Sequence, residues 1–355
     1  MREGRIEKVL NIINDRGLDA CAIRGMDNIF YLTGFVGSEG TLVVTRGDVL
    51  LITDFRYMTY AREVTKDVKI VELKSKRNVL SEICEQYGIR RMAFDSLHTA
   101  YQTYKRWDDA IDDIELVPLE NEIEEIRKCK EPDEIDLISK AVDVATKAFA
   151  EVFERIRPGS TEKQIAGELE YTMKCMGADN TSFDIIVASG ARTALPHAVP
   201  TNKEIKEGEP IIIDFGARVD GYCSDETCTI SVGEVNGKMK EIFSIVNSAR
   251  ELGMEKARAG MSIKDLDMIV RGFIDDQGYG EYFKHGVGHG VGIAVHEAPA
   301  ITSTGDGILE ENMVITIEPG IYIPNLGGVR LEDMLLITGD GAKVLTHLRK
   351  EMLSI

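Results

Sequence analysis

Four acidic residues and one histidine in the second half of the chain have types and spacing suited to binding metal ions. They are Asp214, Asp225, His289, Glu318 and Glu332. Four carboxylates gathered in one buried region repel one another, so some must take up protons unless cations neutralise them. Oxygen ligands with one imidazole suit Mn²⁺, Co²⁺, Zn²⁺ or Fe²⁺, and we take Mn²⁺ as the first expectation. We expect two such ions about 3.5–4 Å apart, a spacing that activates one water.

The two aspartates are expected on one β-hairpin. Asp214 follows the apolar run Ile211–Ile213, and Asp225 comes eleven residues later, beyond the turn-like Val219-Asp220-Gly221. If the loop centres on the first two residues of this turn, the carboxylates face one another directly. If it centres on the last two, they are diagonal neighbours. Because side chains alternate along a strand, both registers keep the carboxylates on one face.

The two glutamates are expected on a second hairpin, and His289 in a glycine-dense segment. Glu318 and Glu332 lie fourteen residues apart around the loop PNLGG (324–328), so they too share a face. His289 belongs to HGVGHGVG (285–292), where missing side chains let the backbone pass close to a ligand cluster. No strand–GxGxxG–helix arrangement surrounds it, so a phosphate loop is not indicated. Each residue alone is better explained as a salt-bridged acid or a structural histidine, but the five together favour metal.

The second half of the chain contains an internal repeat with an offset of 101 residues. Thr161 with Gln164 predicts a capping box, and Ser262 with Asp265 predicts its counterpart in the second copy. A few matching glycines can arise by chance, so the polar residues must pair as well. The residues identical at this offset are Arg157, Gly159 and Gly177 against Arg258, Gly260 and Gly278.

Unusual polar residues do recur between the two copies. With small shifts, PHAVP (196–200) resembles VHEAP (295–299), and IIIDFG (211–216) resembles ITIEPG (315–320). A duplicated unit usually places its site at the interface of the copies. The matched pairs are His197 with His296, Asp214 with Glu318, and Asp225 with Glu332.

The first third of the chain has an α/β pattern. Helices are expected over residues 5–14, 57–64 and 79–87, and strands over residues 19–23, 41–45, 49–53, 68–71 and 92–94. Charges crowd together over residues 119–136, and Pro132 suits the first turn of a helix. We therefore expect an α/β (α+β) chain with an N-terminal domain over 1–122 and a catalytic domain over 123–355. The alternative for the charge run is a solvated helix face inside one domain.

Composition narrows the class of protein. The chain has 42 Lys and Arg against 60 Asp and Glu, a net charge of −18, which disfavours nucleic acid as a partner. The first residues, MREGRIEKVL, lack the apolar core of a signal peptide, and no apolar stretch has membrane-spanning length. Six scattered cysteines form no C-x-x-C pair. A cytoplasmic protein without membrane or nucleic-acid partners is expected.

Several segments resemble a known family in order and spacing. IIIDFGARVDGYCSDET, HGVGHGVGIAVHE, TIEPGIY and GVRLEDM are similar to the ligand-bearing segments of the pita-bread metallopeptidases, in the aminopeptidase P and prolidase branch. YLTGFVGSEGTLVVT and LLITDFRYMTYA resemble the smaller, creatinase-like N-terminal domain of that branch, so nearly the whole chain is covered. The resemblance implies a homodimer in which the small domain controls substrate access. One departure is Cys228, where the family often has Arg, which bears on packing behind the ligands.

The resemblance implies a role for each motif residue. Asp214 and Asp225 are implied to bind one metal, and Asp225 to share the second with His289. Glu318 and Glu332 are implied to hold and bridge the pair.

Five further residues are implied to act on the substrate. His197 matches the residue that contacts the scissile-bond region and assists with protons. His296, Arg330 and Tyr322 match positions that orient the substrate, and His285 matches one that lines the proline pocket. A buried structural role is the alternative for His197 and His296. For Arg330 the alternative is charge balance with a neighbouring acid.

The activity implied is hydrolysis of the bond before proline in short peptides with proline at the second position. A hydroxide that bridges the ions would attack the carbonyl, and Glu318 would carry the water's proton to the leaving nitrogen. We expect a Xaa-Pro aminopeptidase, with a Xaa-Pro dipeptidase (prolidase) of the same fold as the alternative. A non-catalytic binding protein and a metal-free amidinohydrolase of the creatinase type are weaker alternatives, because neither needs an intact acidic cluster.

Overall fold

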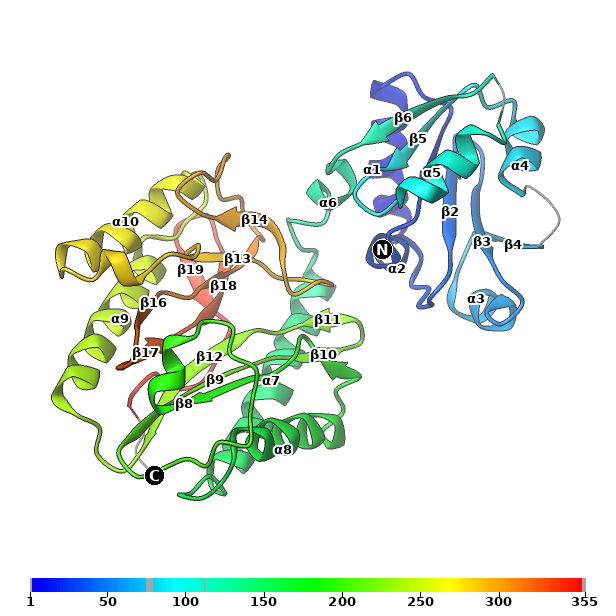
Figure 1. Ribbon diagram of the computed structural model, residues 1–355. Coiled ribbons are helices and arrows are strands. Elements are labelled where there is room, and N and C mark those ends of the chain that lie inside the picture. The colour runs from blue at the N-terminus through cyan, green and yellow to red at the C-terminus, as the bar shows by residue number, and fades with distance from the viewer. Residues whose placement is uncertain (1, 75–78, 112, 353–355) are drawn as a thin grey trace. The chain divides into compact units, whose positions relative to one another are not determined.

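The computed structural model describes residues 2–74, 79–111 and 113–352, which form two compact units divided between Arg127 and Lys128 (Figure 1). The boundary expected after residue 122 lies five residues earlier. Helix α6 (Glu122–Glu125) stays with the first unit because Asn28 donates a hydrogen bond to Glu124 at 2.7 Å. No helix among the described residues is long and apolar enough to span a bilayer.

The first unit is a six-stranded mixed sheet with helices. Its order is β4-β3-β2-β1-β5-β6, in which β2 is antiparallel to β1 and β3 and the other pairs are parallel. The strands are β1 (Ala20–Ile23), β2 (Thr41–Thr45), β3 (Val49–Thr53), β4 (Lys69–Glu72), β5 (Arg91–Asp95) and β6 (Glu115–Leu119). The other helices are α1 (Arg2–Asp15), α2 (Met26–Thr33), α3 (Met58–Val64), α4 (Val79–Tyr87) and α5 (Tyr101–Asp108).

All the helices and strands expected in this unit are confirmed, and four elements are additional, namely α2, α5, α6 and β6. β6 contains Pro118, which lacks a backbone N–H, and an edge strand tolerates that loss. α2 and α5 are helices of eight residues each, and α6 has four.

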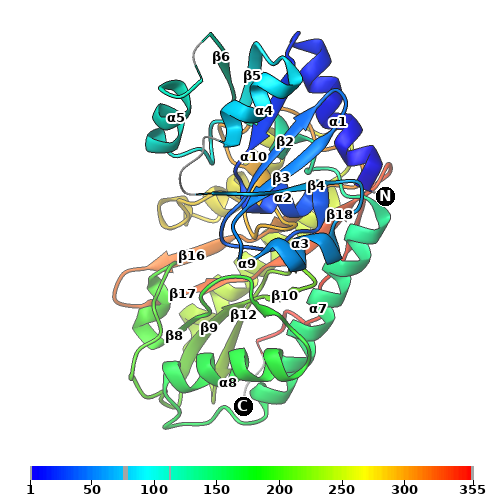
Figure 2. The same ribbon diagram turned by 90° about the vertical axis from the view of Figure 1, so that its right-hand side faces the viewer.

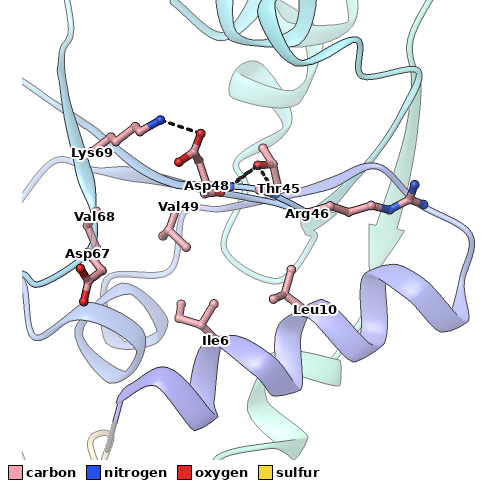
Figure 3. A pocket seen from close by; sticks show the side chains of 10 residues that line it. Ile6, Leu10, Thr45, Arg46, Asp48, Val49, Asp67, Val68 and Lys69 are labelled. Carbon is pink, nitrogen blue, oxygen red and sulfur yellow. Dashed lines mark hydrogen bonds and ion pairs between the residues drawn. The ribbon is translucent and has the colours of Figure 1, made fainter.

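A groove of about 560 Å³ lies in the first unit, with α1 on one side (Figure 3). Ile6 and Leu10 of α1 face it together with Val49, and Lys69 pairs with Asp48 at 2.6 Å near its edge. None of the side chains that line this groove belongs to the expected metal site.

The second unit consists of two similar halves, each with two helices followed by antiparallel strands (Figure 2). The first half contains α7 (Pro132–Phe153), α8 (Glu162–Cys175), β7 (Asn180–Thr181), β8 (Ile186–Ser189), η1 (Gly190–Ala194), β9 (Glu209–Phe215), β10 (Ala217–Val219), β11 (Tyr222–Cys223) and β12 (Glu226–Val232). The second contains α9 (Gly237–Lys256), α10 (Ile263–Asp276), η2 (Gly280–Tyr282), β13 (Gly288–Gly290), β14 (Glu297–Ile301), β15 (Val314–Ile317), β16 (Gly320–Ile323), β17 (Gly327–Arg330), β18 (Asp333–Ile337) and β19 (Ala342–Val344).

The internal repeat is confirmed in atomic detail. Thr161 and Gln164 form the complete capping box that was predicted for α8. At α10 Ser262 accepts from the backbone N–H of Asp265, but the described bonds include no return bond from the Asp265 side chain, so only half of the second box is present. Before each cap, a glycine with positive φ donates its N–H to a carbonyl beyond the helix, Gly159 to Ile205 at 2.9 Å and Gly260 to Leu309 at 2.8 Å. The positive φ of 89° and 81° explains why glycine is needed at both positions.

Each half buries its helices on one face of its strands. In β9, Ile211, Ile213 and Phe215 belong to the core with α7 and α8, and Phe149 of α7 stacks on Phe215 with ring centroids 5.1 Å apart. In β15, Ile315 and Ile317 belong to the core with α9 and α10. Because side chains alternate, the other face of each strand is free for polar groups.

Candidate metal centre

The first ligand hairpin has one of the two predicted registers. Val219 pairs with Tyr222, so the turn centres on Asp220 and Gly221, whose φ values of 48° and 86° are those of a type I′ turn. The same register continues into β9 and β12, where Asp214 pairs with Thr227. Asp225 is therefore the diagonal neighbour of Asp214, on the face opposite the helix core.

The second hairpin places its glutamates directly opposite each other. Ile317 pairs with Asp333 before them, and Gly320 pairs with Arg330 after them. Glu318 and Glu332 fall at the break between these two ladders, in one continuous register. The loop is the three residues 324–326, two shorter than the expected 324–328, since Gly327 already pairs with Ile323.

His289 lies on β13 and its side chain approaches the acids. The glycines on either side of it, Gly288 and Gly290, are in close contact with neighbouring backbone. His289 Nε2 lies 3.5 Å from Asp225 Oδ2 and 3.6 Å from Glu318 Oε1. Asp225, His289 and Glu332 offer ligand atoms that all lie within 4.8 Å of one another. A Cβ on Gly288 would meet Thr316 O at 2.0 Å, which confirms that absent side chains let this strand approach.

Hydrogen bonding and burial keep the imidazole of His289 neutral and set its tautomer, as a metal ligand requires. Its Nδ1 lies 3.0 Å from the carbonyl oxygen of Gly290. Because that carbonyl only accepts, Nδ1 carries the hydrogen and Nε2 keeps its lone pair toward the acids. Burial lowers the pKa of His289 to about 4, so the imidazole is neutral near pH 7.

Burial and mutual repulsion disfavour the charged forms of Asp225, Glu318 and Glu332. Burial raises the pKa of Asp225 well above its usual range, and the carboxylates of Glu332, Asp214 and Glu318 add to it. Burial likewise raises the pKa of Glu332, and that of Glu318 to about 8. These shifts are those expected where divalent ions would replace protons.

One unsatisfied oxygen supports the same conclusion. Asp214 Oδ1 is buried and has no hydrogen-bond partner among the described residues, while Oδ2 accepts from Arg330 Nη2 at 2.6 Å. A buried acceptor without a donor is costly, and a cation removes that cost. The residues therefore fit a pair of divalent ions.

Arg330 is buried and bonded to protein groups. Besides Asp214, its guanidinium donates to the hydroxyl of Tyr322 and the carbonyl of Pro196, both at 3.0 Å. Its ion-pair partner is thus Asp214, rather than Glu332 or Asp333 beside it. In this arrangement Arg330 orients the Asp214 carboxylate and the Tyr322 hydroxyl.

His285 and Tyr322 form one hydrogen-bonded pair. His285 Nε2 lies 2.9 Å from Tyr322 Oη, and His285 Nδ1 lies 2.8 Å from the carbonyl oxygen of Gly286. Since Nδ1 donates to that carbonyl, Nε2 accepts from the tyrosine hydroxyl, which in turn accepts from Arg330. Burial lowers the pKa of His285 to about 4, consistent with a neutral ring.

His197 and His296 are both exposed, which argues against the buried structural role considered for them. The ring of His296 lies 4.2 Å from that of His289, measured between centroids. His197 lies in the loop between η1 and β9, next to Pro196, whose carbonyl is bound by Arg330.

Comparisons with known proteins identify the family of both parts of the chain. A model of metallopeptidase family M24 matches residues 136–339, and a model of the creatinase/prolidase N-terminal domain matches residues 5–129. The chain belongs to metallopeptidase family M24.

Three relatives cover almost the whole M24 chain. A Xaa-Pro dipeptidase of Pyrococcus furiosus is 39% identical over 354 residues, covering 98% of this chain and 99% of that protein. The structure of a Xaa-Pro dipeptidase from Bacillus anthracis is 37% identical with a TM-score of 0.96, covering 100% of both chains. The structure of an X-Pro aminopeptidase from Thermotoga maritima is 37% identical with a TM-score of 0.93, covering 99% of both.

At Cys228, where related M24 sequences were expected to have Arg, the thiol is buried in the core beside α7 and α8. Burial raises the pKa of Cys228 to about 12, so it stays protonated. It lies on the helix face of β12, with Glu226, and not on the opposite face, which carries Asp225 and Thr227.

Glu162, a residue that sequence reasoning missed, holds the loop of His197 at both ends. Its fully buried carboxylate accepts from the backbone N–H and hydroxyl of Ser189 and of Thr201, at 2.7 to 3.0 Å, and from Arg192 Nε at 3.1 Å. The TE pair at the start of α8 signals a helix cap, but nothing local indicates these distant partners.

Glu162→Gln is expected to lower kcat/KM about tenfold while metal content stays the same. One amide N–H would face a donor, and hydrogen bonds to a charged group contribute about 1.5–3 kcal/mol each. Steady-state rates and metal analysis test this. Glu170→Gln is the matched control, since Glu170 is exposed on the same helix and pairs with Lys174. Equal losses in both variants would contradict a specific role for Glu162.

Proposed function

We propose that this M24 enzyme is a metal-dependent Xaa-Pro dipeptidase. The observation that carries the proposal is the convergence of buried acids from both halves with His289, which fits two divalent ions. Two of the three relatives described are named Xaa-Pro dipeptidases and one X-Pro aminopeptidase. The dipeptidase, our alternative from sequence, is therefore better supported than the aminopeptidase we expected first.

The chain's residues would divide the chemistry between them. Asp214, Asp225, His289, Glu318 and Glu332 would hold the ions. When bound, the ions supply an activated water and stabilise negative charge on the carbonyl oxygen. Glu318 would take the water's proton and deliver it to the leaving nitrogen, because its side chain, 20% exposed, remains accessible beside His289.

The histidines around the centre would bind the substrate. His197 and His296 are exposed, so their rings are accessible to the peptide and can donate to its carbonyl or carboxylate oxygens. The pair His285–Tyr322 would line the side that receives the proline ring. A bond to proline is a tertiary amide without N–H, so recognition must depend on ring shape and carboxylate rather than on that hydrogen.

Three finer assignments are also proposals. We propose Mn²⁺ as the native ion, since carboxylate-rich sites suit it. We propose a homodimer, on the resemblance of the first unit to creatinase-like domains. We propose a cytoplasmic location, which six free cysteines support because a reducing compartment keeps thiols free.

The proposal is tested by comparing hydrolysis of Gly-Pro and Ala-Pro-Ala by Mn²⁺-loaded protein. A dipeptidase cleaves Gly-Pro and leaves the tripeptide largely intact, because a closed site has no space beyond the proline carboxylate. Comparable rates on both would favour the aminopeptidase. Equal cleavage of Ala-Ala-Ala would show that proline is not required at all.

A further inference from the structure

Two acids follow metal ligands directly along the chain and point the other way. Glu226 follows Asp225, and Asp333 follows Glu332. Because side chains alternate, Glu226 and Asp333 project from the helix faces of the two ligand strands. Both are 2% exposed, so they form a buried acidic pair behind the metal centre.

A lysine near the end of the chain lies between these two acids. Lys350 Nζ is 2.6 Å from Glu226 Oε1 and 3.8 Å from Asp333 Oδ1, and its side chain is 1% exposed. Arg250 of α9 pairs with the other oxygen of Asp333. Two cations thus face two acids in a region without water access, and Lys350 is the one that touches both.

The segment that carries Lys350 is also bonded along its length to the ligand strands. The backbone N–H of Leu345 donates to Met334 O at 2.9 Å, and that of Leu348 donates to Glu226 Oε1 at 3.3 Å. The hydroxyl of Thr346 donates to Asp333. Residues 345–350 therefore cross behind both strands and join them.

On the other face, hydrogen bonds join the two strands directly, from Asp225 N to Met334 Sδ at 3.1 Å and from Thr229 Oγ1 to Arg330 O at 2.8 Å. Glu332 N donates to Thr227 O at 3.1 Å, and Thr227 Oγ1 donates to Glu332 Oε2 at 2.8 Å. A metal pair needs its ligands held to about 0.5 Å, which demands support from behind as well as from within. Repulsion between Glu226 and Asp333 without Lys350 would separate the strands that carry Asp225 and Glu332.

We propose that Lys350 is a positioning residue that fixes the spacing of Asp225 and Glu332 and so sets the affinity for the metal ions. This inference rests on the proposed metal-dependent function. Lys350 touches neither ligand and acts through the residues next to them. Residues 345–350 are thereby part of the support of the proposed metal centre.

The test compares Lys350→Met with Lys140→Met. Lys140 pairs with Asp220 at 2.7 Å, is exposed, and reaches the tip of the hairpin that carries Asp225. Metal dissociation constants are measured by competition of Mn²⁺ with a fluorescent chelator, together with the melting temperature of the metal-free proteins. We expect Lys350→Met to weaken metal binding about 10–100-fold, as loss of support behind a ligand does, and Lys140→Met to leave it within about twofold.

A double variant separates spacing from a general loss of stability. Glu226→Gln combined with Lys350→Met removes the unpaired buried charge, so metal affinity should recover in part relative to the single change. It also serves if the single variant does not fold. A melting temperature that falls in Lys350→Met with an unchanged dissociation constant would overturn the inference and leave a purely structural role. Wild-type protein that binds no metal would overturn the proposed function itself.

Discussion

Asp225→Asn is expected to abolish hydrolysis, with a loss of at least about 10³-fold in kcat/KM, because metal activation supplies several kcal/mol of transition-state stabilisation. Asp225 is in the group whose ligand atoms lie within 4.8 Å of one another, together with His289 and Glu332. The amide keeps the shape of the side chain but lacks the charge, and its nitrogen cannot bind a cation. Metal content measured by emission spectrometry should fall with the rate.

The matched control for that change is Asp220→Asn. Asp220 lies in the turn of the same hairpin, is exposed, and pairs with Lys140 at 2.7 Å, so its loss should change rates less than about twofold. An Asp225→Asn protein that keeps its metal and its rate within tenfold of wild type would contradict the assignment of the centre.

Removing the metals is expected to reverse how stability depends on pH. In the metal-free protein the pKa of Glu318 is about 8, raised from an unfolded value of 4.5 by burial, and those of Asp225 and Glu332 are raised as well. Between pH 4.5 and about 8 the folded state therefore binds more protons than the unfolded state. Its free energy of unfolding therefore falls as pH rises from about 4.5 toward 8.

The histidines define the best window for that measurement. Burial lowers the pKa of His285 and His289 from 6.5 to about 4, so they make stability rise with pH up to 6.5 and oppose the acids there. Above pH 6.5 these two histidines no longer contribute. His98, whose pKa is raised by its hydrogen bond to Glu124, then adds to the fall in stability that the acids cause. Urea unfolding of chelator-treated protein should show falling stability across this range.

Metal-loaded protein should behave in the opposite way over the same range. Ligands must lose protons to bind, so metal affinity and the stability it adds increase with pH. Glu318→Gln is the control, because it removes a group that titrates near 8 and should flatten the slope of the metal-free protein. Identical slopes with and without metal would contradict a centre in which cations replace protons.

Most of what the sequence predicted about the candidate ligands came from the alternation of side chains along a strand. The hairpin register of Asp214 and Asp225 needed only a two-residue turn and period-two side chains, and the structure has one of the two registers so derived. His289 was indicated by glycines that permit close approach, and the contact between Gly288 and Thr316 is of that kind. Short strands of branched residues in the first unit were equally local signals.

Hydrogen-bond and ion-pair partners that are distant in sequence could not be predicted from local patterns. Arg330 bonds to Asp214 across 116 residues, and no local pattern distinguishes that partner from the acids beside Arg330. Glu162 directly follows the cap residue Thr161, and nothing in that local pattern indicates that the five donors to its carboxylate come from residues 189–201. Lys350 lies in a polar tail without periodicity, and only the fold brings it between Glu226 and Asp333.

The duplication of the second unit has a consequence for how the centre fills. Each copy contributes two acids, but only the second copy contributes a histidine. The backbone of His289 bonds to Thr316 of the neighbouring strand. The equivalent position in the first copy is Ala188, which pairs with Ile212. The approximate symmetry therefore ends at the ligands. The two cations would therefore occupy unequal positions, one with a nitrogen ligand and one with oxygen ligands alone. Their binding to the metal-free protein would proceed in two distinguishable steps.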